Sequence, residues 1–198
     1  MNKIRFFYIL TFLLFLNPKT SFGLIEVDIT RGNLNPLPIA VSPLFVEIKS
    51  IKAFQNLLKK KNVGEDIATV VEKNLKSSGL FNPLKKEAFL QKPDIAHLKP
   101  RFEDWSLIKA QALITGEVKF ENEKLRVEFR LWDVLAGKEM MALAFTTVPE
   151  NWRRVGHIIT DKVYQRLTGE KGYFDTRIIY VSEEGPKTNR VKKLAIMD

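Results

Sequence analysis

Three stretches with strand-like patterns, followed by a long amphipathic helix, constrain the fold of this chain most. In Leu125–Leu131 apolar residues alternate with charged ones, which predicts a strand with one buried face. Ala112–Phe120 and Met140–Thr147 flank it, and both connections are short enough for hairpins. Pro149–Leu167 has an apolar stripe at helical spacing, so this helix can cover the apolar face of the antiparallel meander. The stripe consists of Trp152, Val155, Ile159, Val163 and Leu167.

Shorter elements precede the meander. Pro38–Pro43 is typical of a buried strand that ends at a proline, and Leu80–Leu84 of a short edge strand. Gly64–Ser78 has the pattern of a second main helix, and Arg101–Ala110 that of a short one. Ser50–Lys61 begins with a helical turn or two. The class is therefore α+β, a mixed sheet of about five strands packed by two main helices.

Two further strands are predicted at the end of the sequence. Asp175–Ser182 and Val191–Met197 flank a loop with Gly185 and Pro186. A two-stranded hairpin is marginally stable alone. We therefore expect it to be the opening of a further domain.

Residues 1–23 have the layout of a secretory signal peptide. Lys3 and Arg5 precede an uncharged run, Phe6–Leu16, and small residues stand at Ser21 and Gly23. The alternative is a retained membrane anchor, but a spanning helix needs roughly 20 apolar residues, about twice this run. We expect cleavage after Gly23, so that the mature chain begins at residue 24 and is exported.

Charge and cysteine content narrow the function classes. The formal net charge of +9 falls to +6 when the leader's three cations are subtracted. Export and the dispersed charge argue against nucleic acid as a partner, and we expect at most peripheral membrane contact. The chain has no cysteine, which excludes disulfides, thiolate metal sites and a cysteine nucleophile. An exported chain of this kind relies on its hydrophobic core.

The sequence offers little material for catalysis. His97 stands in a polar loop, and His157 has Asp161 four residues on, on the same helix face. A structural or interface role for His157 and a catalytic one both remain open, although no nucleophile elbow, phosphate loop or metal-ligand spacing accompanies it. Neighbouring acids such as Glu103 and Asp104 point apart. We expect no enzyme, no cofactor and no metal site.

Three tryptophans leave a binding module as an alternative. Trp105, Trp132 and Trp152 could form a sugar-binding or stacking surface, and a binding module would use Trp132 with neighbouring tyrosines. Trp105 and Trp152 fit core positions, whereas Trp132 faces away from its apolar neighbours and fits an interface.

Several segments, taken together, resemble the TolB family of periplasmic Tol–Pal proteins. The resemblance covers nearly all of the mature chain, and only Val46–Lys61 departs from the usual connection. It rests on Pro38–Val41, Leu75–Phe81, Gly116–Val118, Leu131–Asp133, Trp152–Tyr164 and Leu167–Ile178, which occur in this order.

The resemblance implies a domain division and partners. It implies a signal peptide at 1–23, a partner-binding segment and loop at 24–37, an α/β domain at 38–172, and the start of a truncated six-bladed β-propeller at 173–198. The propeller of the family binds Pal, the peptidoglycan-associated lipoprotein, so that surface should be missing here. The mature N-terminal segment binds the C-terminal domain of TolA. In this chain the segment is Leu24, Ile25, Glu26, Val27, Asp28, Ile29 and Thr30.

The mode of binding follows from the pattern of that segment. Ile25, Val27 and Ile29 alternate with polar residues, as in a strand. It could add to the edge of a partner's sheet, or it could complete the chain's own sheet. The resemblance implies a non-catalytic adaptor that supports outer-membrane integrity and constriction during cell division. The alternatives are an exported solute- or carbohydrate-binding module and a hydrolase with an unrecognised site.

Overall fold

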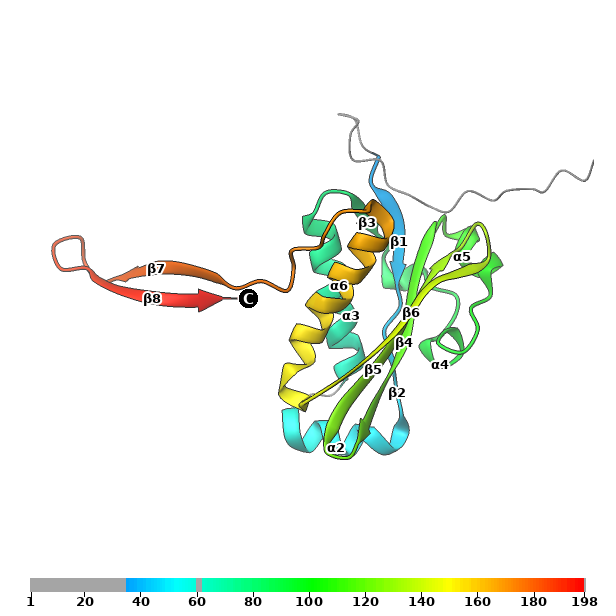
Figure 1. The fold of residues 1–198 in the computed structure, drawn as a ribbon, viewed down its shortest axis with the longest axis horizontal. Helices are drawn as coiled ribbons and strands as arrows, with labels where there is room; N and C mark the ends of the chain where they lie inside the picture. Colours follow the sequence, from blue (N-terminus) through cyan, green and yellow to red (C-terminus); the bar gives the residue numbers. More distant parts are fainter. Residues whose placement is uncertain (1–34, 60–61, 198) are drawn as a thin grey trace, which may run out of the picture.

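A computed structural model describes residues 35–59 and 62–197 (Figure 1). The main sheet has the strand order β3-β1-β4-β5-β6, and β2 pairs with β4 beside this path. The strands of this sheet are β1 (Leu37–Val41), β2 (Phe45–Val46), β3 (Phe81–Pro83), β4 (Ala112–Glu121), β5 (Lys124–Asp133) and β6 (Lys138–Thr147). The helices are α2 (Ile48–Leu58), α3 (Val63–Ser77), η1 (Lys86–Ala88), α4 (Pro93–Ala96), α5 (Phe102–Leu107), η2 (Pro149–Asn151) and α6 (Trp152–Thr168).

The sheet is mixed, which confirms the predicted α+β class. β1 runs parallel to both β3 and β4, whereas β4, β5 and β6 form the predicted antiparallel meander. β3 lies at one edge of the sheet and β6 at the other. The two parallel pairings arise because helical connections return the chain to the same end of the sheet.

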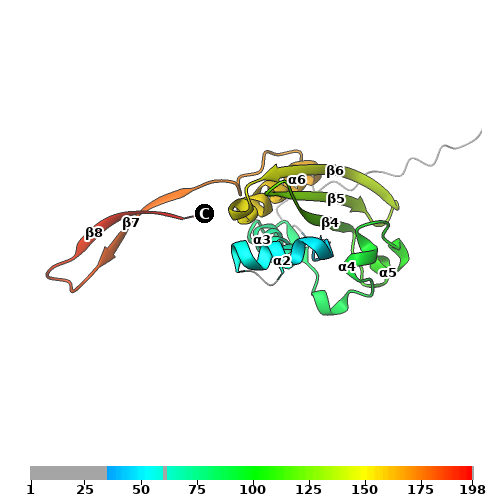
Figure 2. The ribbon, with the colours of Figure 1, turned by 90° about the horizontal axis from the view of Figure 1, so that it is seen from below.

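The main core lies between one face of the sheet and the helices α3 and α6 (Figure 2). Val155, Ile159, Val163 and Leu167 of the predicted stripe are buried, while Trp152 is half-buried. At Gly156 a Cβ atom would lie only 2.8 Å from Val70 Cγ1 of α3. The missing side chain at this position therefore allows the two helices to pack closely.

The local sequence explains the boundaries of both main helices. The Asn62 side chain accepts the N–H of Glu65 at the start of α3, which provides one of the helix's unmatched donors with a partner. The helix α6 follows a 3₁₀ turn that begins at Pro149. Gly169, with φ of 77°, ends α6 in the left-handed region, which glycine adopts without a steric penalty.

The far face of the sheet carries a second, smaller core, which the sequence analysis did not predict. Leu113 of β4 points to this side and is buried against Trp105 of α5. The Trp105 indole N–H donates to Gln91 Oε1 at 3.0 Å, so the buried ring has a polar partner. The prediction of a single apolar face is therefore wrong for the start of β4. The remaining buried members of this core are Ala40, Ala96, Ala110 and Val134.

The described part of Val46–Lys61, the segment that we expect to depart from the family pattern, contains the last residue of β2 and the helix α2. The helix is longer than the predicted turn or two and buries Phe54. The buried Ser50 hydroxyl accepts the N–H of Phe120 at 2.8 Å, which ties α2 to the end of β4. The segment thus completes one end of the main core.

The predicted C-terminal hairpin is present as β7 (Ile178–Glu184) and β8 (Val191–Met197). It extends away from the sheet, beyond α6 (Figures 1 and 2). Its large apolar side chains are between 44% and 80% exposed, unlike the buried ones of β4 and β5. These are Ile178, Ile179, Tyr180, Val181, Val191, Leu194, Ile196 and Met197.

Candidate functional site

The predicted partner-binding segment lies outside the described residues, because the described chain begins at residue 35. This applies to Leu24, Ile25, Glu26, Val27, Asp28, Ile29 and Thr30, and also to the predicted signal peptide at 1–23. Both therefore stay predictions.

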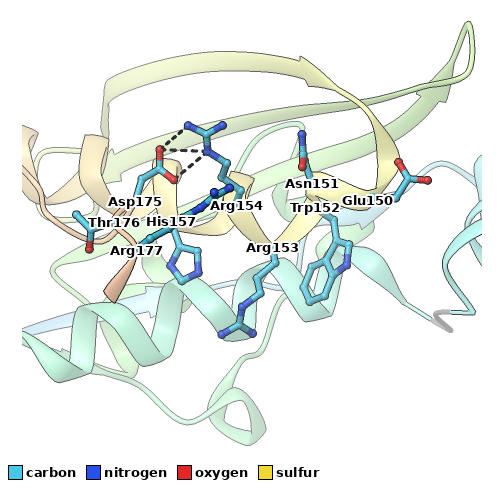
Figure 3. Close-up of a pocket in the computed structure, with 9 residues that line it drawn as sticks. All are labelled: Glu150, Asn151, Trp152, Arg153, Arg154, His157, Asp175, Thr176 and Arg177. Carbon is cyan, nitrogen blue, oxygen red and sulfur yellow. Dashed lines mark hydrogen bonds and ion pairs between the residues drawn. The ribbon is translucent and has the colours of Figure 1, made fainter. Parts of the chain in front are cut away.

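Within the described residues, a polar pocket of about 460 Å³ lies at the N-terminal end of α6, between the helix and the linker that follows it (Figure 3). The first two turns of α6 form one wall, and the linker between α6 and β7 forms the other. The pocket is lined by Glu150, Asn151, Trp152, Arg153, Arg154, His157, Asp175, Thr176 and Arg177.

Asp161 of α6 holds this linker through its backbone. Its carboxylate accepts the N–H of Phe174 at 2.7 Å and the N–H of Asp175 at 3.1 Å. The linker passes so close that a Cβ atom at Gly172 would lie 2.5 Å from Asp161 Cα. A hydrogen bond to a charged acceptor is stronger than one between neutral groups. The half-buried Asp161 therefore serves as the main polar anchor of the linker.

An ion pair adds a second polar contact. Arg154 donates from Nε to Asp175 Oδ1 at 3.0 Å and from a terminal nitrogen to Oδ2 at 3.2 Å (Figure 3). The hydrogen bond from Arg154 to Asp175 raises the pKa of that guanidinium. Because Arg154 is exposed, solvent screens the pair and its contribution to stability is small. The paired geometry nonetheless orients the linker where it turns toward β7.

Aromatic rings complete the linker's attachment. Tyr164 of α6 makes edge contacts with Phe174 and with Tyr173, and also with Phe81 of β3. Burial raises the pKa of the Tyr164 hydroxyl. The linker is thus held on α6 by both apolar and polar contacts, and it carries the chain from the domain to the hairpin in a defined direction.

His157 lies on the α3 side of the pocket and has a structural partner. The side-chain amide nitrogen of Asn74 lies 2.8 Å from His157 Nδ1 and 3.2 Å from Thr160 Oγ1. Because that amide nitrogen is a donor, Nδ1 is the acceptor in this pair. Asp161, four residues on, is used by the linker amides. The contacts support the structural reading of His157, which joins α6 to α3.

His97 lies in surroundings that differ from the predicted polar loop. It follows α4, is buried, and stacks on Phe45 with ring centroids 4.5 Å apart. Its Nδ1 lies 2.9 Å from the carbonyl oxygen of Pro93. The ring helps to fix α4 against β2.

The three tryptophans do not share one surface. Trp105 is buried in the second core, and Trp132 donates from its indole N–H to Thr115 Oγ1 at 2.9 Å while packing against that core. Trp152 packs against the main core on the other face of the sheet. This arrangement gives no common stacking surface for a sugar.

Among residues 35–59 and 62–197, no group of three or more histidine, aspartate or glutamate side chains is arranged to hold a metal ion. In the same residues no helix is both long and apolar enough to cross a membrane.

Comparison with known proteins identifies the family. The model of the TolB amino-terminal domain matches residues 25–140. The Tol-Pal system protein TolB of Pelagibacter ubique (strain HTCC1062) is 73% identical over 195 residues, which is 98% of this chain. The chain belongs to the TolB family. The resemblance found in the sequence is therefore confirmed.

A solved structure of the TolB family agrees in fold. TolB from Acinetobacter baumannii superposes with a TM-score of 0.63 at 21% identity and covers 88% of this chain. At this identity the match supports the fold alone. The chain spans 43% of the length of the Pelagibacter relative and 39% of the Acinetobacter chain.

The linker anchor is the part of the site that sequence reasoning missed. Asp161 and Phe174 are thirteen residues apart, and one lies on a helix while the other lies on an irregular segment. Helical periodicity cannot detect such a pair. The glycine and aromatic residues of Gly172–Phe174 were the only available signal.

Proposed function

We propose that this chain is part of a non-catalytic periplasmic adaptor of the Tol–Pal cell-envelope system, which supports outer-membrane integrity and constriction during cell division. The observation that carries the proposal is the 73% identity, over 98% of the chain, to a Tol-Pal system protein. The described residues offer hydrogen-bonded histidines and a linker-docking site, and these contacts suit a structural module better than a catalyst.

The proposed contact with TolA lies in Leu24–Thr30. Its Ile25, Val27 and Ile29 would form one apolar face of a strand that adds to the edge of the TolA C-terminal domain. Backbone hydrogen bonds would supply affinity, and the alternate side chains would supply specificity. The loop predicted at 31–37 would separate this segment from β1.

The proposed contact with Pal belongs to a β-propeller that begins with β7 and β8. The exposed apolar side chains on this hairpin support the idea, because such side chains are normally covered by further protein. The anchored linker also supports it, since it directs the hairpin away from the domain. The polypeptide of residues 24–198 should therefore bind TolA but not Pal.

Calorimetric titration of the polypeptide 24–198 with a TolA C-terminal domain tests the proposal. We expect saturable binding that disappears when Leu24–Thr30 is deleted, while circular dichroism shows that the domain remains folded. Titration with Pal should give no heat of binding. TolA binding that survives the deletion would exclude this segment as the TolA site. Pal binding would show that the Pal site lies in residues 24–198 and not in the rest of the β-propeller.

A matched pair of variants tests the strand-addition mechanism. Val27→Pro removes a backbone donor and fixes φ, so it should abolish binding if the segment pairs as a strand. Val27→Thr keeps the branched shape and the backbone donor, and it should bind within a few-fold of the parent. Equal affinities for the two variants would exclude backbone pairing at this residue.

A further inference from the structure

The edge strand β6 is long, and beyond the register shift opposite Leu131 and Trp132 it lacks the protection that natural edge strands normally carry. It pairs along its length with β5, and among the strands that the structure describes no other pairs with it. Its only charged residues are Lys138 and Glu139 at its start, and Met141–Thr147 contains neither proline nor a charge. Edge strands are usually protected by such residues or covered by another element. In both overall views the hairpin lies beyond α6, away from β6 (Figures 1 and 2).

The helix side of this edge is bordered by cations. Arg166 of α6 donates to the carbonyl oxygen of Met140 at 3.4 Å, so its row of the helix faces β6. Lys162 lies one turn earlier on the same row and is exposed. Among the described residues, neither cation has an acidic side chain within 4.0 Å. Leu143 of β6, which pairs with Phe129 of β5, is exposed.

The outer side of the same edge has space for large side chains. Ala142 and Ala144 are exposed there and line a shallow hollow of about 180 Å³. Arg126 and Arg130 of β5 line it too, but each already has an acidic partner, Glu128 and Glu139 respectively. On the outer side the arginines are therefore neutralised by acidic partners and the β6 side chains are small, whereas the helix side carries positive charge that is unpaired among the described residues.

We infer that β6 is a second interaction surface, which binds an extended partner segment of alternating apolar and acidic residues by strand addition. The spacing fits: residues i and i+4 of a helix are about 6 Å apart along its axis, and alternate residues of a strand are about 7 Å apart. Two acids at alternate positions would thus reach Lys162 and Arg166. The intervening apolar side chains would pack over Ala142 and Ala144.

Electrostatics favours this partner over a second copy of the chain. Antiparallel pairing of two β6 strands would place both α6 helices on the same face of a continuous sheet. The Lys162 and Arg166 side chains of both copies would then face one another, and like charges oppose such pairing. The surface is separate from the proposed TolA contact, so the two can fail independently.

The test uses a seven-residue peptide of alternating valine and glutamate as the probe. Amide exchange should show new protection within Met141–Thr147, limited to alternate residues, since only alternate amides of an edge strand face outward. A valine–lysine peptide should bind at least tenfold more weakly. The valine–glutamate peptide N-methylated on its β6-facing amides should not bind, whereas methylation of the opposite amides should leave binding intact.

Charge reversal on the protein gives the matching control. Lys162→Glu should weaken binding of the valine–glutamate peptide at least tenfold and strengthen binding of the valine–lysine peptide. Lys73→Glu, on the exposed side of α3, should change the affinity for neither peptide. Equal binding of the two peptides, or no new protection of the outward-facing amides of Met141–Thr147 at millimolar peptide, would overturn the inference. Protection of those outward-facing amides without any peptide would also overturn it, because the edge would then be covered by the protein itself or by a second copy, whereas the inward-facing amides are already paired with β5.

Discussion

Replacing Asp161 should release the linker from α6 without unfolding the domain. The carboxylate accepts two backbone N–H groups, from Phe174 and Asp175. A hydrogen bond to a charged group contributes about 1.5–3 kcal/mol. Because Asp161 is half-buried, we expect Asp161→Ala to cost the docked linker about 2–3 kcal/mol in all. That corresponds to a population of undocked linker roughly 30 to 150 times larger.

Hydrogen exchange measured by mass spectrometry tests this prediction directly. Peptides covering 170–177 should exchange faster in Asp161→Ala by the factor given above, while the exchange of β4 and β5 stays unchanged. Asp161→Asn keeps one carbonyl acceptor and should fall between Asp161→Ala and the parent. Glu170→Gln removes the same charge from an exposed side chain and serves as the control. Parent-like exchange of 170–177 in Asp161→Ala would refute the role of this carboxylate as the anchor.

Further substitutions test the packing of α6 and the burial of Tyr164. Ile159→Ala should lower the free energy of unfolding in urea by about 2–5 kcal/mol because the side chain is fully buried, and a neutral result would contradict the packing of α6. Gly156→Ala should destabilise the protein by up to about 2 kcal/mol, because crowding of Val70 costs about 1–3 kcal/mol and the gain in helix propensity is only about 1 kcal/mol. Val70→Ala should relieve part of this destabilisation in the double variant. Strictly additive effects of the two substitutions in thermal melts would contradict the crowding. Burial raises the pKa of the Tyr164 hydroxyl. The contribution of this group to the stability of the folded state is therefore fully present below the unfolded pKa of about 10, and it is lost as pH rises through the folded pKa. Tyr164→Phe should therefore weaken the alkaline loss of stability, and an unchanged alkaline titration would contradict this.

Elements with a strong local pattern could be predicted from the sequence. β5 alternates buried and half-buried residues from Leu125 to Asp133, as its composition indicates. The stripe of α6 is buried from Val155 onward, and Gly169 ends the helix. In these cases the same residues that set the local conformation also form the core, so periodicity was sufficient.

Features that depend on contacts between distant segments could not be predicted. The helix α4 has four residues, too few for a periodic pattern, so the sequence around His97 indicates only a polar loop. The second core is formed when Leu113, on the far side of β4, meets Trp105 from a separate helix. The docking of Phe174 on Tyr164 and Asp161 likewise depends on the path of the linker in three dimensions.

The proposed adaptor role is tested most directly by heteronuclear NMR of the labelled polypeptide 24–198 with an unlabelled TolA C-terminal domain. We predict that resonance changes concentrate in Leu24–Thr30, with the dispersion of residues 35–197 retained. Changes confined to residues 35–197, with Leu24–Thr30 unaffected at saturation, would contradict the account.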